Sequence, residues 1–357
     1  MTEGQFDSGV TRAIAVAPQG VVTPTGPRVA VLGSGERATE LVRALGNLGA
    51  HAAIAAEPAA VPELFGRQPA DVVIPGPRAW ELTSDTERVR RLAVEELGLP
   101  TAPFWFAESV TELRAVAANA GYPLLVRAGG HCVLVSAPAG PQGIDAAWQR
   151  VAGRDGVRVM AETVVAVEML VTMLAVASDG PRGTVIDFCA PIGHRLNADG
   201  SREACQPLAL SAAALDVGKS IAARVVKAIG ERGLFAVELL VNGDEVYFAE
   251  VSTQLPESAW VTVRTQRLSA FELQARAALG LPADTMMVSP GAALVVNAPA
   301  ATVRLAAVLE VPETDVRQFA GGQRRTGVIL ATGQDVKTSL DRIREVARRR
   351  GVPDSAK

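Results

Sequence analysis

The chain has 357 residues, of which 48% are apolar and 20% charged, and its formal net charge is −3. This length and composition allow two or three domains with real cores, and they exclude a disordered chain. The net charge gives no basic field for nucleic acid or an anionic membrane, and no apolar run approaches the roughly 20 residues that span a bilayer. The 3 cysteines have no CxxC spacing, which argues against a disulfide framework or a zinc site and favours the cytoplasm.

The first quarter of the chain predicts a small nucleotide-type domain. Residues 1–26 are rich in glycine, proline and threonine and lack periodicity, so we expect an attached arm without a core. An apolar strand at 28–32 leads through Gly33-Ser34-Gly35 into a helix that ends near Leu48. This is a G-x-G-x-x-A pattern, whose glycines let the backbone approach an anion at a helix N-terminus.

A dinucleotide-binding fold is the obvious interpretation of that pattern, but the rest of the fold is missing. A second strand at 51–56 ends before Glu57, where such folds place a ribose-binding acid. Only one further strand, at 71–74, precedes helical sequence. Because that is too little for two mononucleotide-binding halves, we expect a truncated Rossmann-like domain and place an NAD-dependent reductase last among the functions.

Helices and strands then alternate. We expect helices at 83–96, 109–119 and 220–230, and strands at 122–127, 158–165, 169–178 and 184–190. Ser109 and Glu112 have the spacing of a capping box. His131 and Cys132 are neighbours in an extended segment, where successive side chains point to opposite faces, so we expect no nucleophilic dyad. We expect His194 to be a hydrogen-bonded structural residue.

Two strands at 235–241 and 245–251 each carry a carboxylate among apolar neighbours, Glu238 and Glu250. An unpaired buried carboxylate costs several kcal/mol, so this pattern predicts a cation. The alternative is that one acid is solvated and the other pairs with an arginine.

The connection Asn242-Gly243-Asp244 decides whether the two acids can act together. A three-residue turn pairs Glu238 with Phe248 and Glu250 with Ala236. Both acids then share one face as diagonal neighbours about 7–8 Å apart, within reach of one Mg²⁺ and its phosphates. With a two-residue turn they are expected to face apart.

After the stretch at 269–283, the sequence from about residue 286 predicts a small domain. Its expected elements are strands at 293–296 and 327–331 and a final helix at 336–349. Arg324 and Arg325 precede the second strand, and such a pair can grip a phosphate group or be ordinary surface.

Several runs of this sequence resemble one family. The hairpin GLFAVELLVNGDEVYFAEVS and its flanking helices resemble the metal-binding end of an ATP-grasp domain. With VAVLGSGE, RRLAVEELGLPTAPFWFA, FCAPIGHR and RRTGVILAT, the chain from about 28 to 348 is similar to the formate-dependent phosphoribosylglycinamide transformylases of purine synthesis. This resemblance implies an α/β fold: a truncated Rossmann-like domain at 27–82, an ATP-grasp domain at 83–285 and a small domain at 286–357.

The resemblance also implies a reaction, its cofactors and a set of contacts. ATP and Mg²⁺ convert formate to formyl phosphate, and the formyl group passes to the amine of glycinamide ribonucleotide. The implied metal ligands are Glu238 and Glu250, the implied nucleotide contacts are Arg127, Glu162 and Val165, and the implied substrate contacts are Glu36, Glu257, Arg324 and Arg325. No catalytic residue is assigned, and the family implies a homodimer.

This sequence departs from the family where phosphate and ribose are held. Arg127 replaces a lysine, the loop after it shrinks around Gly129-Gly130, Leu170 replaces the ribose acid, Gln254 replaces a phosphate-binding arginine, and 320–322 replace a lysine. We therefore expect a divergent member with impaired or lost catalysis. The alternatives are an active transformylase with a rebuilt phosphate site, and a non-catalytic binding or regulatory partner of an intact paralogue.

Overall fold

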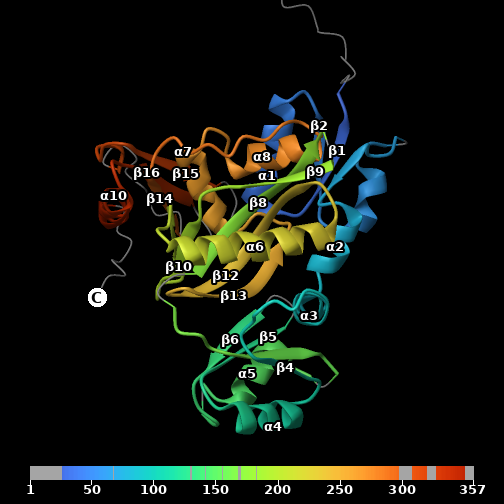
Figure 1. Ribbon diagram of the computed structural model, residues 1–357, viewed down its shortest axis with the longest axis vertical. Coiled ribbons are helices and arrows are strands. Elements are labelled where there is room, and N and C mark those ends of the chain that lie inside the picture. Colours follow the sequence, from blue (N-terminus) through green and yellow to red (C-terminus); the bar gives the residue numbers. More distant parts are fainter. Residues whose placement is uncertain are drawn as a thin grey trace, which may run out of the picture.

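A computed structural model describes residues 26–66, 68–128, 131–140, 142–154, 156–167, 170–181, 183–296, 308–319 and 327–349. The predicted arm at 1–25 lies outside these residues. A large sheet with helices on its faces forms the main body, and a smaller α/β unit lies beside it, at the bottom of the view (Figure 1). None of the described helices has the length and apolar character needed to cross a membrane.

The N-terminal unit is a three-stranded parallel sheet in the order β2-β1-β3. Its strands are β1 (Arg28–Leu32), β2 (His51–Ala55) and β3 (Val72–Ile74), with α1 (Gly35–Asn47) after β1 and a short 3-10 turn at Pro58–Glu63. Gly35 has a φ of 71°, a conformation that favours glycine, where the chain enters α1. The predicted strands and helix are confirmed, and the sheet is as short as the sequence predicts.

The helix predicted at 83–96 is confirmed over most of its length, but it begins later than predicted. It consists of α3 (Thr86–Arg91), which continues directly into a π-helical turn at Leu92–Glu96, and a separate helix, α2 (Pro77–Thr83), precedes it. The Asp85 side chain accepts hydrogen bonds from the amides of Glu87 and Arg88, so it caps a new helix there. The cap separates α3 from α2.

The smaller unit contains a four-stranded antiparallel sheet in the order β4-β7-β5-β6. Its elements are β4 (Phe104–Ala107), α4 (Val110–Ala120), β5 (Leu124–Ala128), β6 (His131–Val135), α5 (Ile144–Val151) and β7 (Val159–Thr163). Leu113, Leu124 and Trp148 are among its core residues. Ser109 caps α4 as predicted, by accepting from the amide of Glu112. The sequence analysis missed β4 and β6.

The main body is a nine-stranded sheet in the order β13-β12-β8-β10-β11-β14-β16-β15, with β9 paired to β8. The strands are β8 (Leu170–Gly180), β9 (Gly183–Phe188), β10 (Ile192–Leu196), β11 (Arg202–Gln206), β12 (Gly233–Asn242), β13 (Glu245–Ser252), β14 (Gly291–Val296), β15 (Thr314–Gln318) and β16 (Gly327–Thr332). Strands of the predicted C-terminal domain thus extend the central sheet. The domain boundary at 286 stays a prediction.

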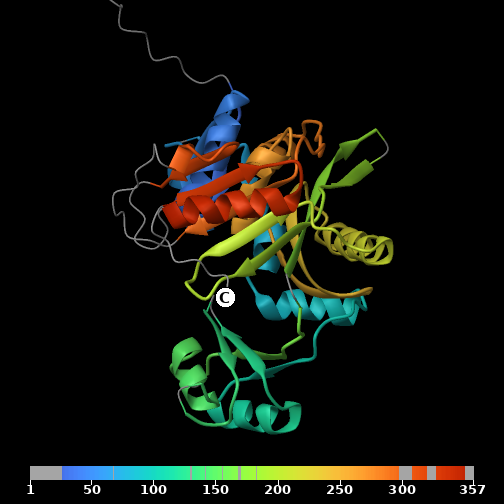
Figure 2. The ribbon, with the colours of Figure 1, turned by 90° about the vertical axis from the view of Figure 1, so that its left-hand side faces the viewer.

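Helices cover both faces of this sheet (Figures 1 and 2). The helices are α6 (Ala212–Ile229), α7 (Thr262–Thr265), α8 (Ala270–Ala278) and α10 (Val336–Arg349), with a 3-10 turn at Glu257–Val261. Leu234 and Ala236 of β12 lie in the core formed with α1 and α8, whereas Phe235 and Val237 lie in the core formed with α6. This alternation buries β12 on both faces.

Candidate functional site

The turn of the β12–β13 hairpin differs from the predicted one. Asn242 pairs with Glu245, so the turn has two central residues, and Leu240 pairs with Tyr247. The predicted three-residue turn is wrong, and so is the pairing of Ala236 with Glu250, because Ala236 lies opposite Ser252. A two-residue turn alone leaves the two acids on opposite faces.

A β-bulge brings the acids together again. Leu239 pairs with Phe248, the register then shifts, and Glu238 pairs with Glu250. One residue more on β13 than on β12 lies between these two pairs, which restores the alternation that the turn would break. Glu238 and Glu250 are therefore directly opposite each other on one face, a closer arrangement than the predicted diagonal one.

Neighbouring strands of the large sheet hold Glu238. The Thr172 hydroxyl donates to Glu238 Oε1 at 2.9 Å, and His194 Nε2 lies 2.7 Å from Glu238 Oε2. Thr172 is opposite Glu238 on β8, and His194 comes from β10 on the far side of β8. His194 is thus hydrogen-bonded, as predicted, but its partner is one of the two proposed metal ligands.

Glu250 has a different partner, which comes from the smaller sheet. Arg127 Nη1 on β5 lies 3.3 Å from Glu250 Oε2, and Arg127 Nη2 lies 3.2 Å from Glu162 Oε2. Arg90 Nη2 of α3 lies 2.6 Å from Glu162 Oε1, and its Nη1 donates to the carbonyl of Phe248 at 3.2 Å. We call Arg90, Arg127, Glu162 and Glu250 the ion-pair cluster.

The ion-pair cluster balances its own charge, with two guanidinium groups and two carboxylates. Glu162 is buried between both arginines, with its side chain 4% exposed, and the Arg90 side chain is 1% exposed. Burial lowers the pKa of Arg90, and the negative charge of Glu162 opposes this effect. Desolvation raises the pKa of Glu250 even though its side chain is 48% exposed, Arg127 opposes this, and the charge of Glu238 raises it further. The two opposed acids therefore repel each other.

Glu238 and Glu250 do not by themselves complete the coordination shell of a metal ion. Within the described ranges, no group of three or more histidine, cysteine, aspartate or glutamate side chains is arranged to hold a metal ion. Two carboxylates suffice for Mg²⁺ when substrate phosphates complete its shell. Here Glu238 is engaged by Thr172 and His194, and Glu250 by Arg127, so a metal must compete with these contacts.

The other positions at which the resemblance implies nucleotide contacts differ in their exposure and in their ability to bind a nucleotide. Val165 lies half-buried in the segment after β7. Leu170 begins β8, opposite Leu240 of β12, and its side chain cannot bind a ribose hydroxyl. The shortened loop at Gly129-Gly130 lies outside the described residues.

One implied substrate residue, Glu257, lines a second hollow, between α1 and the large sheet. We call it the boundary pocket; its volume is about 260 Å³, and it is lined by Arg37, His194, Arg202, Glu203, Ala204, Pro256, Glu257, Ser258, Ala293 and Val295. Glu257 is buried, and its Oε2 lies 3.0 Å from Arg202 Nε. Glu36 is half-buried in the first turn of α1, next to Arg37. Arg324, Arg325 and 320–322 lie outside the described residues.

His194 connects the two sites, because it lines the boundary pocket and contacts Glu238. The Ser258 hydroxyl, also in the pocket, lies 3.0 Å from the Thr172 hydroxyl. The sequence analysis did not place Arg90, Thr172, His194 or Arg37 at a site. Arg90 and His194 do lie within sequence runs that carry the family resemblance. Those runs were the available indication that the two residues belong to a site.

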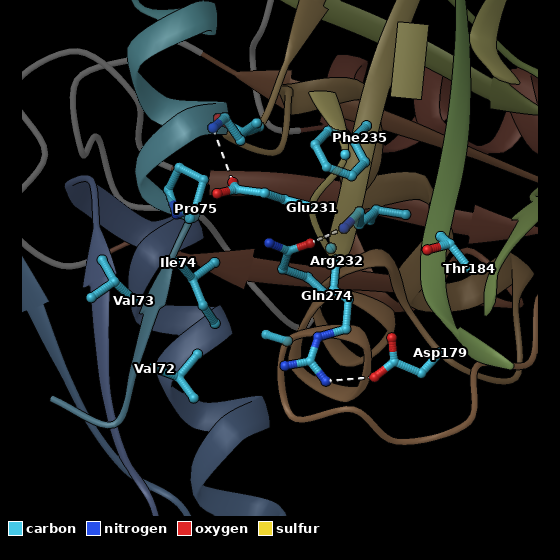
Figure 3. A pocket seen from close by; sticks show the side chains of 17 residues that line it. Val72, Val73, Ile74, Pro75, Asp179, Thr184, Glu231, Arg232, Phe235 and Gln274 are labelled. Atoms are coloured by element: carbon cyan, nitrogen blue, oxygen red, sulfur yellow. Dashed lines mark hydrogen bonds and ion pairs between the residues drawn. The ribbon is translucent and has the colours of Figure 1, made fainter. Parts of the chain in front are cut away.

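A third hollow of about 550 Å³ lies between β3 and the start of β12 (Figure 3). Glu231 reaches from its wall to the amides of Arg78 and Ala79, at 3.2 and 3.0 Å, and so caps α2. Arg232 pairs with Asp179 at 2.8 Å across its other side. Its polar groups therefore attach α2 and the end of β8 to the segment that leads into β12.

The cysteines offer no activated nucleophile. Burial raises the pKa of Cys189 to about 12 and that of Cys205 to about 11. Cys132 is exposed on β6, and desolvation raises its pKa as well, although Arg127 opposes this. A raised pKa leaves little reactive thiolate at neutral pH, which agrees with the expectation that His131 and Cys132 form no dyad.

Comparison with known proteins agrees with this architecture. Residues 92–271 match the model of the ATP-grasp domain. A carboxyaminoimidazole ribonucleotide synthase from Aspergillus clavatus, solved with ATP, covers 91% of this chain and 98% of its own at a TM-score of 0.77 and 18% identity, which supports the fold alone. Fold and sequence together make this chain an ATP-grasp protein.

Nearer relatives define the family. The formate-dependent phosphoribosylglycinamide formyltransferase of Rhodococcus jostii is 42% identical over 299 residues, which cover 78% of this chain and 73% of the relative. A Mycobacterium tuberculosis structure, titled glycinamide-RNase-transformylase T, is 46% identical with a TM-score of 0.73 and covers 90% of this chain and 99% of its own. The chain belongs to the formate-dependent phosphoribosylglycinamide formyltransferase family.

One further relative bears on the truncation. The family member of Thioalkalivibrio sulfidiphilus is 36% identical over 389 residues, covering 92% of this chain and 97% of the relative. That alignment is longer than the 357 residues of this chain, so the relative has residues without a counterpart here. The short N-terminal sheet is consistent with this difference.

Proposed function

We propose that this chain is a divergent member of its family in which ATP-dependent formyl transfer is impaired or lost. The observation that carries the proposal is the position of Arg127, which binds both Glu162 and Glu250. Its guanidinium supplies the positive charge that Glu250 would otherwise take from Mg²⁺. The same side chain replaces the lysine that the resemblance places against the nucleotide phosphates.

Arginine is a poor substitute for lysine at such a position. Lysine presents a compact charge on a flexible stem, whereas the planar guanidinium is suited to bidentate contact with carboxylates. Arg127 bridges two carboxylates, with one nitrogen directed at each, and is only 22% exposed. For ATP·Mg²⁺ to bind through Glu250, the metal has to displace Arg127 from this carboxylate.

Other departures add to this loss. Leu170 cannot bind ribose, and Gln254 carries no charge for a phosphate group. Removing one positioned donor from a site that stabilises developing charge costs about 10²–10³ in rate. Two such losses, even with strong non-additivity, bring an ordinary turnover of about 10 s⁻¹ down to a few per hour.

A turnover assay tests the proposal. Purified protein is incubated with formate, ATP, Mg²⁺ and glycinamide ribonucleotide, and both ADP and the formylated product are followed. We expect a few turnovers per hour or fewer for the wild type and an increase in the Arg127→Lys variant. Arg114 forms an exposed ion pair with Asp145, so Arg114→Lys is the matched control and should leave the turnover unchanged.

One observation favours a second candidate, an active transformylase with a rebuilt phosphate site. The bulge keeps Glu238 and Glu250 opposite each other, as a metal shared by two carboxylates requires. A turnover near one per second in the same assay would establish this candidate and reject the first.

We also propose that the protein is a homodimer, as the resemblance implies. Most closed homo-oligomers are dimers with two-fold symmetry. Light scattering at micromolar concentration should give twice the mass of one chain. A monomer under these conditions would contradict the assignment.

A further inference from the structure

The truncated N-terminal sheet ends in an open strand edge. β3 pairs with β1 along one side, and among the described strands no other pairs with it. Backbone N–H and C=O groups point to both edges of a strand, so the outer edge of β3 keeps donors and acceptors without a strand partner. Residues 72–76, which form β3 and the turn after it, all line the third hollow, of about 550 Å³. The open edge therefore borders a hollow.

The opposite wall of the third hollow is a second incomplete strand edge. Residues 230–235 line this wall and lead into β12. β12 pairs with β8 from Gly233 onward, but with β13 only from Ala236 onward. The amide of Leu234 donates to the Gln274 side chain, so a side chain serves here where a neighbouring strand is missing. The hollow thus lies between strand edges that belong to two different sheets (Figure 3).

The lining of the third hollow suits a peptide. Val72 and Phe235 contribute apolar surface, and the charged lining residues are two carboxylates, Asp179 and Glu231, and one guanidinium, Arg232. An extended peptide can pair its backbone with an open strand edge while its alternate side chains fill the space beside that edge. The excess of acidic groups favours a peptide that carries a cation.

The sequence supplies a segment of this kind. Within the arm at 1–25, residues 13–17 read Ala-Ile-Ala-Val-Ala. When this run is extended, Ile14 and Val16 share one face, and β-branched side chains favour strands. Arg12 comes directly before the run and provides the cation.

The arm also joins the structure close to the open edge. The amide of Arg28 in β1 donates to the Asp71 carboxylate, and the amide of Asp71, just before β3, donates to the Arg28 carbonyl, both at 2.8 Å. A strand on the outer edge of β3 lies two strand spacings, about 10 Å, from β1. Residues 18–25 can span up to about 26 Å. A run that leads back to Gly26 over this short distance lies antiparallel to β3.

We propose that residues 13–17 dock in the third hollow as a further strand against the outer edge of β3 of the same chain. This strand completes the truncated sheet and covers an edge that could otherwise pair with another molecule. The inference is independent of the proposed loss of catalysis, because neither nucleotide nor metal takes part.

Hydrogen exchange of the full-length protein, followed by mass spectrometry, tests the proposal. The amides of residues 13–17 should exchange at least tenfold more slowly than in a synthetic peptide of residues 9–19, because docked amides are hydrogen-bonded. Ala15→Pro removes a donor and is incompatible with a paired strand, so it should abolish this protection. Gln5→Pro, in the arm but outside the run, is the matched control and should leave the protection unchanged.

A second pair of variants tests the place of docking. Thr184 and Val185 are exposed neighbours on β9, and of the two only Thr184 lines the third hollow. Thr184→Trp should fill the hollow and speed exchange at residues 13–17 and at 72–76 at least fivefold. Val185→Trp should change neither, since successive side chains of a strand point to opposite faces.

Three results would overturn the proposal. The first is exchange of residues 13–17 at the rate of the synthetic peptide. The second is protection that persists in Thr184→Trp, which would place the segment elsewhere. The third is protection that is lost on dilution, which would show that a second copy supplies the segment. Thermal unfolding of each variant checks that it is folded, and none of these readouts depends on ATP turnover.

Discussion

Arg127 Nη1 on β5 lies 3.3 Å from Glu250 Oε2 on β13, so one ion pair joins the smaller sheet to the large sheet. Arg90 of α3 reinforces this junction through Glu162. The same carboxylate, Glu250, is half of the acid pair that the sequence predicts as a metal site. Under the proposed function, Arg127 therefore occupies the carboxylate that a nucleotide-bound metal would need.

The acid pair is the first place to test. If ATP·Mg²⁺ binds at all, Glu238→Gln and Glu250→Gln should each reduce its affinity strongly, because the metal needs both carboxylates. The ligand-free Glu250→Gln protein should lose little stability or gain some, since it removes a charge that repels Glu238. Calorimetry and thermal unfolding measure these effects. Unchanged metal-dependent binding in both variants would show that the acids are not the ligands.

The buried half of the ion-pair cluster predicts a large effect on folding. Arg90→Met leaves Glu162 in the interior with Arg127 as its remaining cation, and breaking a buried pair costs about 3–5 kcal/mol. Arg114→Met breaks an exposed pair with Asp145, for which about 0.2–1 kcal/mol is expected. Denaturant unfolding compares the two variants. Similar losses in both would contradict the burial of the cluster.

The raised pKa of Glu250 predicts a pH dependence of stability with a definite sign. The native state binds this proton more tightly than the unfolded chain does. This proton binding adds to the free energy of unfolding. The contribution is fully present below the pKa of Glu250 in the unfolded chain, about 4.3, and is lost as the pH rises through its pKa in the native state. The melting temperature of the wild type relative to Glu250→Gln should therefore fall as the pH rises above about 4. A relative rise would show that the charge of Arg127 outweighs the desolvation of Glu250.

The cap that Glu231 forms on α2 predicts a second effect on stability (Figure 3). Its carboxylate caps α2, so Glu231→Ala should cost about 0.5–2 kcal/mol. A Cβ added at Gly76 would collide with the Glu231 carboxylate, so Gly76→Ala should be destabilising in the wild type and less so in Glu231→Ala. A double-mutant cycle by thermal unfolding measures this coupling. Additive losses would mean that the two residues do not meet.

Local patterns in the sequence predicted most of the helices and strands, because caps and periodicity are local. Ser109 marked the start of α4, and the alternation on β12 marked a strand. The bulge between Glu238 and Leu239 has no such local signal, because it depends on the register in which β13 pairs with β12. The first prediction of the turn was therefore wrong, even though the acids do share a face.

Long-range pairing was also beyond the sequence analysis. β14 joins β11, which extends the central sheet into the predicted C-terminal domain. The residues around Arg90 do not indicate its buried ion pair, because its partner Glu162 is 72 positions away. Such contacts are set by the folded arrangement of sheets and not by the pattern around each residue.

The measurement that tests the central claim most directly is calorimetric titration of the ligand-free protein with ATP·Mg²⁺, beside the Arg127→Lys variant. If Arg127 takes the place of the metal at Glu250, the wild type should bind no more tightly than about 1 mM, equivalent to about −4 kcal/mol, and the variant at least tenfold more tightly. Micromolar binding by the wild type that Glu238→Gln or Glu250→Gln abolishes would contradict the claim.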